Sequence, residues 1–150
     1  MIMEENKNLL VQSLLYDCSK DEIKDIISKT KDSDILYMYA YNYNWDDGFE
    51  IPQLILDHSN CNLSIALLIF YNADGVSYLY NKSCSEGVDQ WFSFVKCLYN
   101  SIINEKYQQT KIEFKVPLSK VELYKLKKVL KEQEKIFIEN IEGENLNIDL

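Results

Sequence analysis

The spacing of apolar residues is the feature that most constrains this chain. Along most of its 150 residues, apolar side chains return every three or four positions, which is the period of an amphipathic α-helix. A chain of this length buries roughly 70% of its unfolded surface, enough for one core without disulfides or structural metal. We therefore expect a mainly α protein, a compact single-domain helical bundle spanning residues 1–150.

Helix start signals support this expectation. Residues 19–22 and 119–122 both read Ser-x-x-Glu, the spacing of a capping box, in which side chains and backbone amides bond reciprocally. The expected helices are residues 4–17, 19–27, 33–43, 51–57, 63–73, 85–103 and 119–130, with Ser33 or Asp34 capping the third and Asn60 or Asn62 the fifth. Residues 63–70 are almost continuously apolar, so this helix should be the buried centre, with residues 85–103 packed on it.

Three segments allow more than one structure. The aromatic residues at 37, 39, 41, 43 and 45 alternate as in a strand, but both neighbouring segments are helical, so helix is favoured. Residues 112–116 alternate apolar and charged side chains, which fits a short strand or an extended linker. Residues 136–138 and 146–150 can form a β-hairpin that turns at residues 142–144. Asp74 and Gly75 end the central helix, with the glycine as its C-terminal cap.

The charge of the chain bears on its partners. Twenty-four acidic residues against sixteen basic ones give a net charge of −8, which repels nucleic acids and anionic membranes and favours a basic protein partner. All sixteen basic residues are lysines, so the bidentate guanidinium fork is absent. Residues 111–135 carry a net +4, but in an acidic protein the lysine-rich helix within them, residues 119–130, is expected to be a solvated face and not a nucleic-acid contact.

Sequence signals for location and cofactors are few. The chain has no apolar run of about 20 residues and no basic, apolar N-terminal signal, so we expect a cytoplasmic protein without membrane spans. Its four glycines are too far apart for a phosphate-binding loop, and its four cysteines form no Cys-x-x-Cys pair. We therefore expect no cofactor. The sequence leaves the oligomeric state open.

Two segments carry a family resemblance. Residues 45–52 (WDDGFEIP) and 61–75 (CNLSIALLIFYNADG) resemble an uncharacterised bacterial family, domain of unknown function 4274, and the similarity continues through residues 91–92 and 117–120. The resemblance implies a small, mainly helical bacterial protein. Since no activity is established for that family, it implies no functional residues.

The densest acidic loop supplies the candidate binding surface. It combines aromatic anchors with carboxylates that can steer a basic partner, and its residues are Tyr43, Trp45, Asp46, Asp47 and Glu50. A calcium loop with Gly48 in sixth position would need carboxylates where residues 43 and 45 stand, so that reading fails. We expect a non-enzymatic protein-binding module, for example an immunity protein that neutralises a basic toxin domain through this surface.

The alternative is a small enzyme or metal-binding protein. It would use Asp46, Asp47, Asp57 and His58 as acid–base or metal-binding groups, with Cys61 as a nucleophile beside the single histidine. A simpler role for His58 is to interact with the terminal carbonyls of the helix at residues 51–57. This hypothesis requires the four side chains to converge in the fold.

Overall fold

The computed structural model describes residues 4–83 and 89–150, and within these ranges the chain is mainly helical, as the apolar period predicted. The helices are α1 (Glu4–Tyr16), α2 (Lys20–Lys29), α3 (Ser33–Tyr41), α4 (Glu50–Asp57), α5 (Leu63–Asn72), α6 (Gly75–Tyr80), α7 (Asp89–Ile103) and α8 (Lys120–Lys127), with 3₁₀ turns η1 (Trp45–Asp47) and η2 (Glu132–Ile138). The helix start predicted at residues 85–88 lies outside the described residues. None of the described helices is long and apolar enough to cross a membrane.

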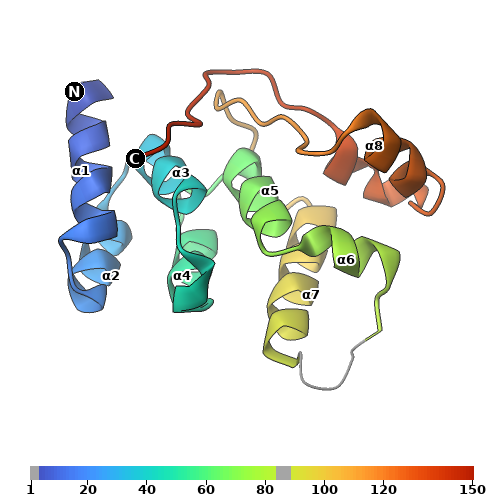
Figure 1. The fold of residues 1–150 in the computed structure, drawn as a ribbon, viewed down its shortest axis with the longest axis horizontal. Coiled ribbons are helices and arrows are strands. Elements are labelled where there is room, and N and C mark those ends of the chain that lie inside the picture. The colour runs from blue at the N-terminus through green and yellow to red at the C-terminus, as the bar shows by residue number, and fades with distance from the viewer. Residues whose placement is uncertain (1–3, 84–88) are drawn as a thin grey trace.

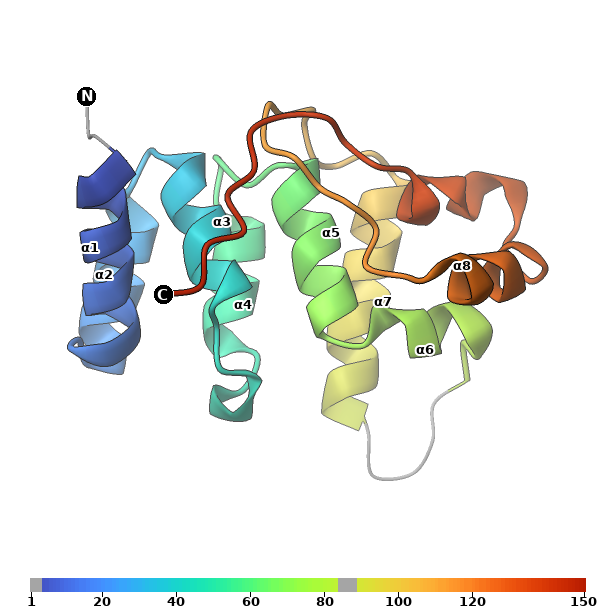
Figure 2. The same cartoon turned by 45° about the horizontal axis from the view of Figure 1, so that its top comes forward.

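The helices stack in two rows. α1, α3 and α5 lie side by side in one row, and α2, α4 and α7 lie in the second (Figures 1 and 2). α3 packs between α1 and α5, α2 packs against α4, and α7 packs against α5, as the sequence predicted for that pair. After η2 the chain returns over α5 and α3 (Figure 2), and the Tyr16 hydroxyl donates to the Leu150 carbonyl oxygen at 2.6 Å.

The centre of this stack is α5. Its residues 63–70 are all buried, which confirms the prediction from their continuous apolar run. The one polar side chain among them, Ser64, donates its hydroxyl to the Ile112 carbonyl oxygen at 2.7 Å, so the core contains no unpaired hydroxyl there. Asn62 caps the helix by accepting from the Ile65 amide at 3.1 Å.

The aromatic stretch at residues 37–45 is helical as far as Tyr41. Its strand-like alternation arises because α3 is enclosed by its neighbours, so residues 35–40 are all buried and no polar face marks the helical period. Its cap is Asp32, one residue before the two predicted candidates, and Asp32 Oδ1 accepts from the Asp34 amide at 3.0 Å. Both predicted capping boxes, at Ser19 and Ser119, are confirmed.

The predicted C-terminal hairpin is wrong. Residues 136–138 belong to η2, and residues 146–150 lie along α3 instead, where the Asn42 side chain donates to the Ile148 carbonyl and accepts from the Leu150 amide, both at 2.9 Å. Residues 112–114 meet residues 141–144 through isolated bridges, Ile112 with Glu144 and Phe114 with Ile141. The described residues contain no regular strand, so the extended-linker interpretation of residues 112–116 holds.

The end of α5 also differs from the prediction. The residue with left-handed backbone is Asp74, at φ 60°, and Gly75 is the buried first residue of α6. A glycine is needed there because a Cβ would lie 2.4 Å from the Phe70 ring. The glycine therefore serves a close approach between α5 and α6 and does not cap α5.

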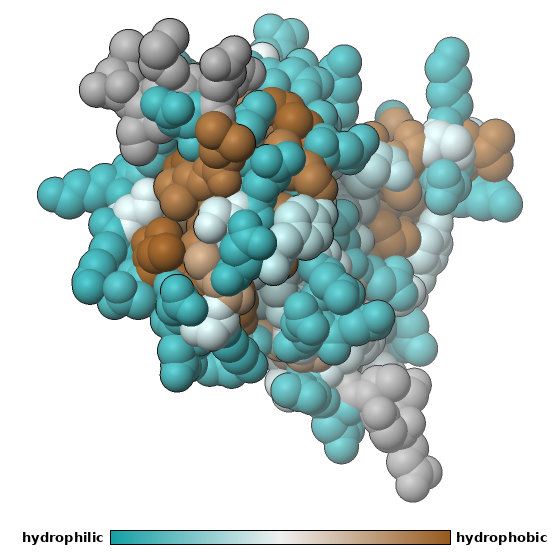
Figure 3. Space-filling model, turned by 60° about the vertical axis from the view of Figure 1, so that its left-hand side comes forward, coloured by the Kyte–Doolittle hydropathy of each residue, from teal (hydrophilic) through white to brown (hydrophobic). Residues whose placement is uncertain are grey.

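The α1 end of the stack carries exposed apolar side chains. Figure 3 shows apolar residues gathered among polar ones on this side of the molecule. Leu9 and Tyr16, both on α1, are 64% and 69% exposed. No other described helix covers this outer face of α1.

Candidate functional site

The loop that carries the predicted binding surface is held by its own polar contacts. The Asn44 side chain accepts from the Asp46 amide at 3.1 Å, which starts η1, and the Tyr43 hydroxyl donates to the Gly48 carbonyl oxygen at 2.7 Å. Gly48 ends η1 at φ 90° and ψ −167°, a backbone conformation that essentially only glycine adopts. The loop therefore presents Trp45, Asp46 and Asp47 from a fixed turn.

Replacing Gly48 by alanine should lower the free energy of unfolding by about 1–3 kcal/mol. The reason is backbone strain alone, since apart from the two neighbouring residues no described residue has an atom within 4 Å of the position that the new Cβ would take. Urea denaturation of the wild type and the variant measures the difference. An unchanged unfolding midpoint would contradict the positive φ at this position.

The five predicted surface residues separate into three kinds. Tyr43 is buried, and burial raises the pKa of its hydroxyl to about 12, so it is a structural residue. Glu50 is exposed but bonds to Lys20 Nζ at 2.6 Å and to Lys24, and hydrogen bonds from these two ammonium groups lower its pKa to about 2. Its charge is thus neutralised locally. Trp45, Asp46 and Asp47 remain for contact with a partner.

Trp45 forms one wall of an open cavity of about 550 Å³ that we call the tryptophan pocket. The pocket lies where η1 and the start of α4 meet the end of α5 and the start of α7. Its lining residues are Trp45, Phe49, Asn72, Ala73, Asp74, Ser77 and Trp91. Its walls are mostly apolar, and behind them Phe94 of α7 contacts the rings of Trp45 and Phe49, with centroids 6.2 and 4.7 Å away.

The two tryptophans differ in how their indole N–H groups are satisfied. Trp91 Nε1 donates to the Ala73 carbonyl oxygen at 2.6 Å, which fixes α7 to the end of α5. Trp45 Nε1 is enclosed and has no hydrogen-bond partner among residues 4–83 and 89–150. An unpaired buried donor costs about 1–3 kcal/mol. Trp45 therefore contributes through its ring contacts and not through a hydrogen bond, since the ring packs edge-on against Tyr43 and Phe49.

Three acids lie in the lining of this pocket or directly after one of its lining residues. Asp46 and Asp47 follow Trp45 in η1, and Asp74 lies in the lining. The Asp74 carboxylate accepts from the Ser77 hydroxyl at 2.7 Å, and none of these three acids forms an ion pair with another described residue. The pocket thus combines an apolar interior with carboxylates that are free to meet an incoming cation.

The residues of the alternative catalytic or metal site do not converge. Asp46 and Asp47 precede α4, whereas Asp57 and His58 end it, about 12 Å away along an eight-residue helix. The Asp57 carboxylate accepts from the Gln53 side-chain Nε2 at 3.1 Å. Across residues 4–83 and 89–150, no three His, Cys, Asp or Glu side chains are grouped to hold a metal ion.

His58 and Cys61 have structural roles. The His58 ring does not contact the carbonyls at the end of α4, as the sequence suggested, because its Nδ1 accepts from the Asn60 amide at 2.9 Å and so closes the turn to α5. Cys61 is 7% exposed, and burial raises the pKa of its thiol to about 12. The sulfur is therefore protonated at neutral pH and unsuited to act as a thiolate nucleophile.

The described chain is a stack of helices in two rows, with an open aromatic pocket between the end of α5 and the start of α7. Residues 31–103 match the family model described as Domain of unknown function (DUF4274), which confirms the resemblance seen in the sequence. The match contains every residue of the tryptophan pocket and ends before residues 117–120. No curated protein and no solved structure matches this chain significantly.

The sequence indicated one wall of this pocket and missed the other. The sequence predicts only that the helix containing Trp91 packs on the central helix and that Asp74 ends the central helix, and it gives Phe49 no role in a site. A local pattern holds no signal that joins residues 45 and 91, because their approach depends on how α5 positions its two neighbours. The one signal in the sequence was the size of Trp91, since an indole ring is larger than the side chains that usually form the apolar face of a helix.

Proposed function

We propose that this chain is a non-enzymatic protein-binding module that holds a basic segment of a partner protein in the tryptophan pocket. One observation carries the proposal: the pocket is walled by Trp45, Phe49 and Trp91, and the acids around it have no basic partner among the described residues. Aromatic walls and unpaired carboxylates together suit a side chain that is apolar along its length and cationic at its end.

Lysine and arginine have this shape. Their methylene stems can cover an indole face while the charged end remains near carboxylates and water. A cation over a tryptophan ring contributes about 0.5–2 kcal/mol, and such anchors in pockets carry much of the energy of protein interfaces. The net charge of −8 would also accelerate the encounter with a basic partner.

Within this class we propose a bacterial immunity protein, acting in the cytoplasm, that neutralises a basic toxin domain. Rapid encounter matters for such a protein because the toxin must be captured before it acts, and acidic surfaces supply that speed. The support is the charge and the pocket of this chain together. The bacterial source and the toxin partner are parts of the proposal.

The test uses random peptides displayed on phage, selected on the purified wild-type protein. We expect the enriched peptides to contain lysine or arginine next to an apolar residue. Their affinity should fall about tenfold in the Asp46→Lys/Asp47→Lys variant, because two attractive charges become repulsive, and it should weaken with added salt. Fluorescence polarisation with synthetic peptides of the selected sequences measures the change.

Two controls separate the pocket from general acidity. Asp17→Lys/Asp149→Lys makes the same charge change at exposed acids that neither line the pocket nor lie in η1, and it should change affinity less than threefold. Trp45→Ala removes a wall and should abolish binding, whereas Trp45→Phe keeps a smaller aromatic wall and breaks no hydrogen bond among the described residues, so it should retain part of the binding. Selected peptides without basic residues, or equal losses in both charge variants, would overturn the proposal.

A further inference from the structure

A second cavity lies at the opposite end of α5 from the tryptophan pocket. It is an open cleft of about 600 Å³, formed by the start of α3, residues 59–62 between α4 and α5, residues 108–112, and Glu144. We call it the polar cleft. Its floor is buried, since Cys61 and Asn62 are each 7% exposed and Ile112 is 4% exposed, while most of its rim is exposed and polar.

The floor presents an unused hydrogen-bond donor. Asn62 Oδ1 accepts from the Ile65 amide at 3.1 Å as the cap of α5, which leaves the Nδ2 group for other contacts. This Nδ2 donates to no other described residue. The side chain is more than nine-tenths buried, but Nδ2 is not among the enclosed unpaired atoms of the described residues, so solvent reaches it and it can donate to a ligand oxygen in the cleft.

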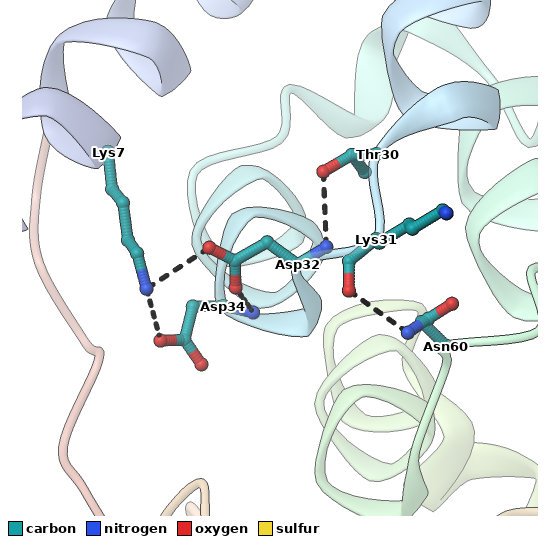
Figure 4. A network of polar contacts seen from close by, with 6 residues as sticks. All are labelled: Lys7, Thr30, Lys31, Asp32, Asp34 and Asn60. Atoms are coloured by element: carbon teal, nitrogen blue, oxygen red, sulfur yellow. Dashed lines mark hydrogen bonds and ion pairs between the residues drawn. The ribbon is translucent and has the colours of Figure 1, made fainter. Parts of the chain in front are cut away.

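The walls of the cleft are held rigidly by polar contacts (Figure 4). Lys7 of α1 reaches across to Asp34 at 2.9 Å and to Asp32 at 3.1 Å, and these bonds raise the pKa of Lys7. The Asn60 side chain donates to the Lys31 carbonyl oxygen at 3.0 Å, which ties the α4–α5 turn to the start of α3. The carboxylate of Asp34 is therefore already bonded, although the single ammonium that it shares with Asp32 leaves a net charge of −1 at this wall.

Two opposite charges on the rim remain without partners. Lys111 and Glu144 both line the cleft, and their backbones meet where the Glu144 amide donates to the Lys111 carbonyl oxygen at 2.7 Å. Their side chains form no ion pair with each other or with another described residue. Besides the bonded Asp34, the cleft thus offers one cation, one anion and a neutral amide donor.

We infer that the polar cleft binds a small zwitterion, an α-amino acid with a polar side chain. Its carboxylate would pair with the Lys111 ammonium and its ammonium with the Glu144 carboxylate, while its side-chain oxygen accepts from Asn62 Nδ2. A simple anion would meet the repulsion of Glu144, and a simple cation that of Lys111. A nucleotide needs more positive charge than one lysine supplies.

This inference is independent of the proposed protein-binding function. The two cavities share no lining residue and are separated by the length of α5, about 15 Å for ten residues. Changes to the acids of the tryptophan pocket should leave amino-acid binding intact, and changes in the polar cleft should leave peptide binding intact. Failure of one proposal therefore does not decide the other.

The experiment measures binding of L-glutamine, L-asparagine and L-serine to the full chain by isothermal titration calorimetry. We expect saturable one-to-one binding of at least one of them. The N-acetylated and the C-amidated derivatives of that amino acid should bind at least about tenfold more weakly, because each lacks one of the two charges. No saturable binding, or equal binding of both blocked derivatives, would overturn the inference.

Variants assign the binding to the cleft. Lys111→Gln and Glu144→Gln should each weaken binding about tenfold, whereas Lys115→Gln and Glu142→Gln, which lie on the same two segments outside the cleft, should not. Asn62→Ser retains a residue that caps helices well and removes the Nδ2 donor, so it should weaken binding in a folded protein, as circular dichroism can verify. Binding that is unchanged in all three cleft variants would place the ligand elsewhere and refute the assignment.

Discussion

Replacing Glu134 by alanine is expected to lower the free energy of unfolding by about 3 kcal/mol, because it removes the acceptor of a buried network. Glu134 is fully buried in η2 and accepts from the Tyr99 hydroxyl at 2.5 Å, from Lys82 Nζ at 2.9 Å and from the Lys131 amide at 2.9 Å. Without the carboxylate, these donors lose their partner. Lys82 is about one third exposed and can regain water, so we expect the lower end of the range for buried pairs.

The pH dependence of stability provides a second readout of the same contact. Burial alone would raise the pKa of Glu134, but the Lys131 amide, the Tyr99 hydroxyl and the Lys82 ammonium together lower it below its ordinary value. A lowered pKa in the folded state means that the contribution is complete above the unfolded value of about 4.3 and is lost as the pH falls through the folded value. Between neutral pH and acid, the wild type should therefore lose more stability than Glu134→Ala.

Urea denaturation at several pH values measures both effects. Glu132→Ala is the matched control, since Glu132 lies on the same turn, is exposed, and in the described part of the chain pairs only with Lys135, at 2.9 Å. An exposed pair of this kind contributes roughly 0–1 kcal/mol. Equal losses in the two variants would show that the Glu134 network does not hold η2 against α7.

The sequence predicted the parts of this fold that depend on short-range contacts. The capping boxes at Ser19 and Ser119 were identified correctly because each is closed within four residues. The burial of α5 followed from an apolar run that leaves no polar face. Such features need no knowledge of which helix lies beside which.

The failures concern residues whose partners lie far along the chain. Ile136 and Ile138 alternate as in a strand, but they form η2 because Glu134 and Phe137 are buried beside α7 and α5. Residues 146–150 follow α3 because the side chain of Asn42, more than a hundred residues away, donates one hydrogen bond to their backbone and accepts another from it. The same reason hid the second wall of the tryptophan pocket and the pairing of Glu50 with Lys20 and Lys24.

Gly75→Ala is expected to lower the free energy of unfolding by about 1–3 kcal/mol, although a glycine-to-alanine change in a helix ordinarily stabilises it. The new Cβ would lie 2.4 Å from Phe70 Cε1. Phe70 is fully buried and packs against Phe137 of η2 at 4.6 Å between ring centroids, so its ring has little space to move away. The sign of the change thus distinguishes steric overlap from helix propensity.

A double-mutant cycle with Phe70→Leu tests this cause. Leucine removes the ring atoms that the new methyl group would meet, so Gly75→Ala should cost less in the Phe70→Leu background than in the wild type. Additive losses in thermal or urea unfolding would contradict the overlap.

The same substitution should also affect the tryptophan pocket, because Gly75 directly follows Ala73 and Asp74 in its lining. Gly75→Ala should weaken binding of the selected basic peptides, and Phe70→Leu/Gly75→Ala should recover part of that binding. The close approach of α6 to α5 would then be what places one side of the pocket.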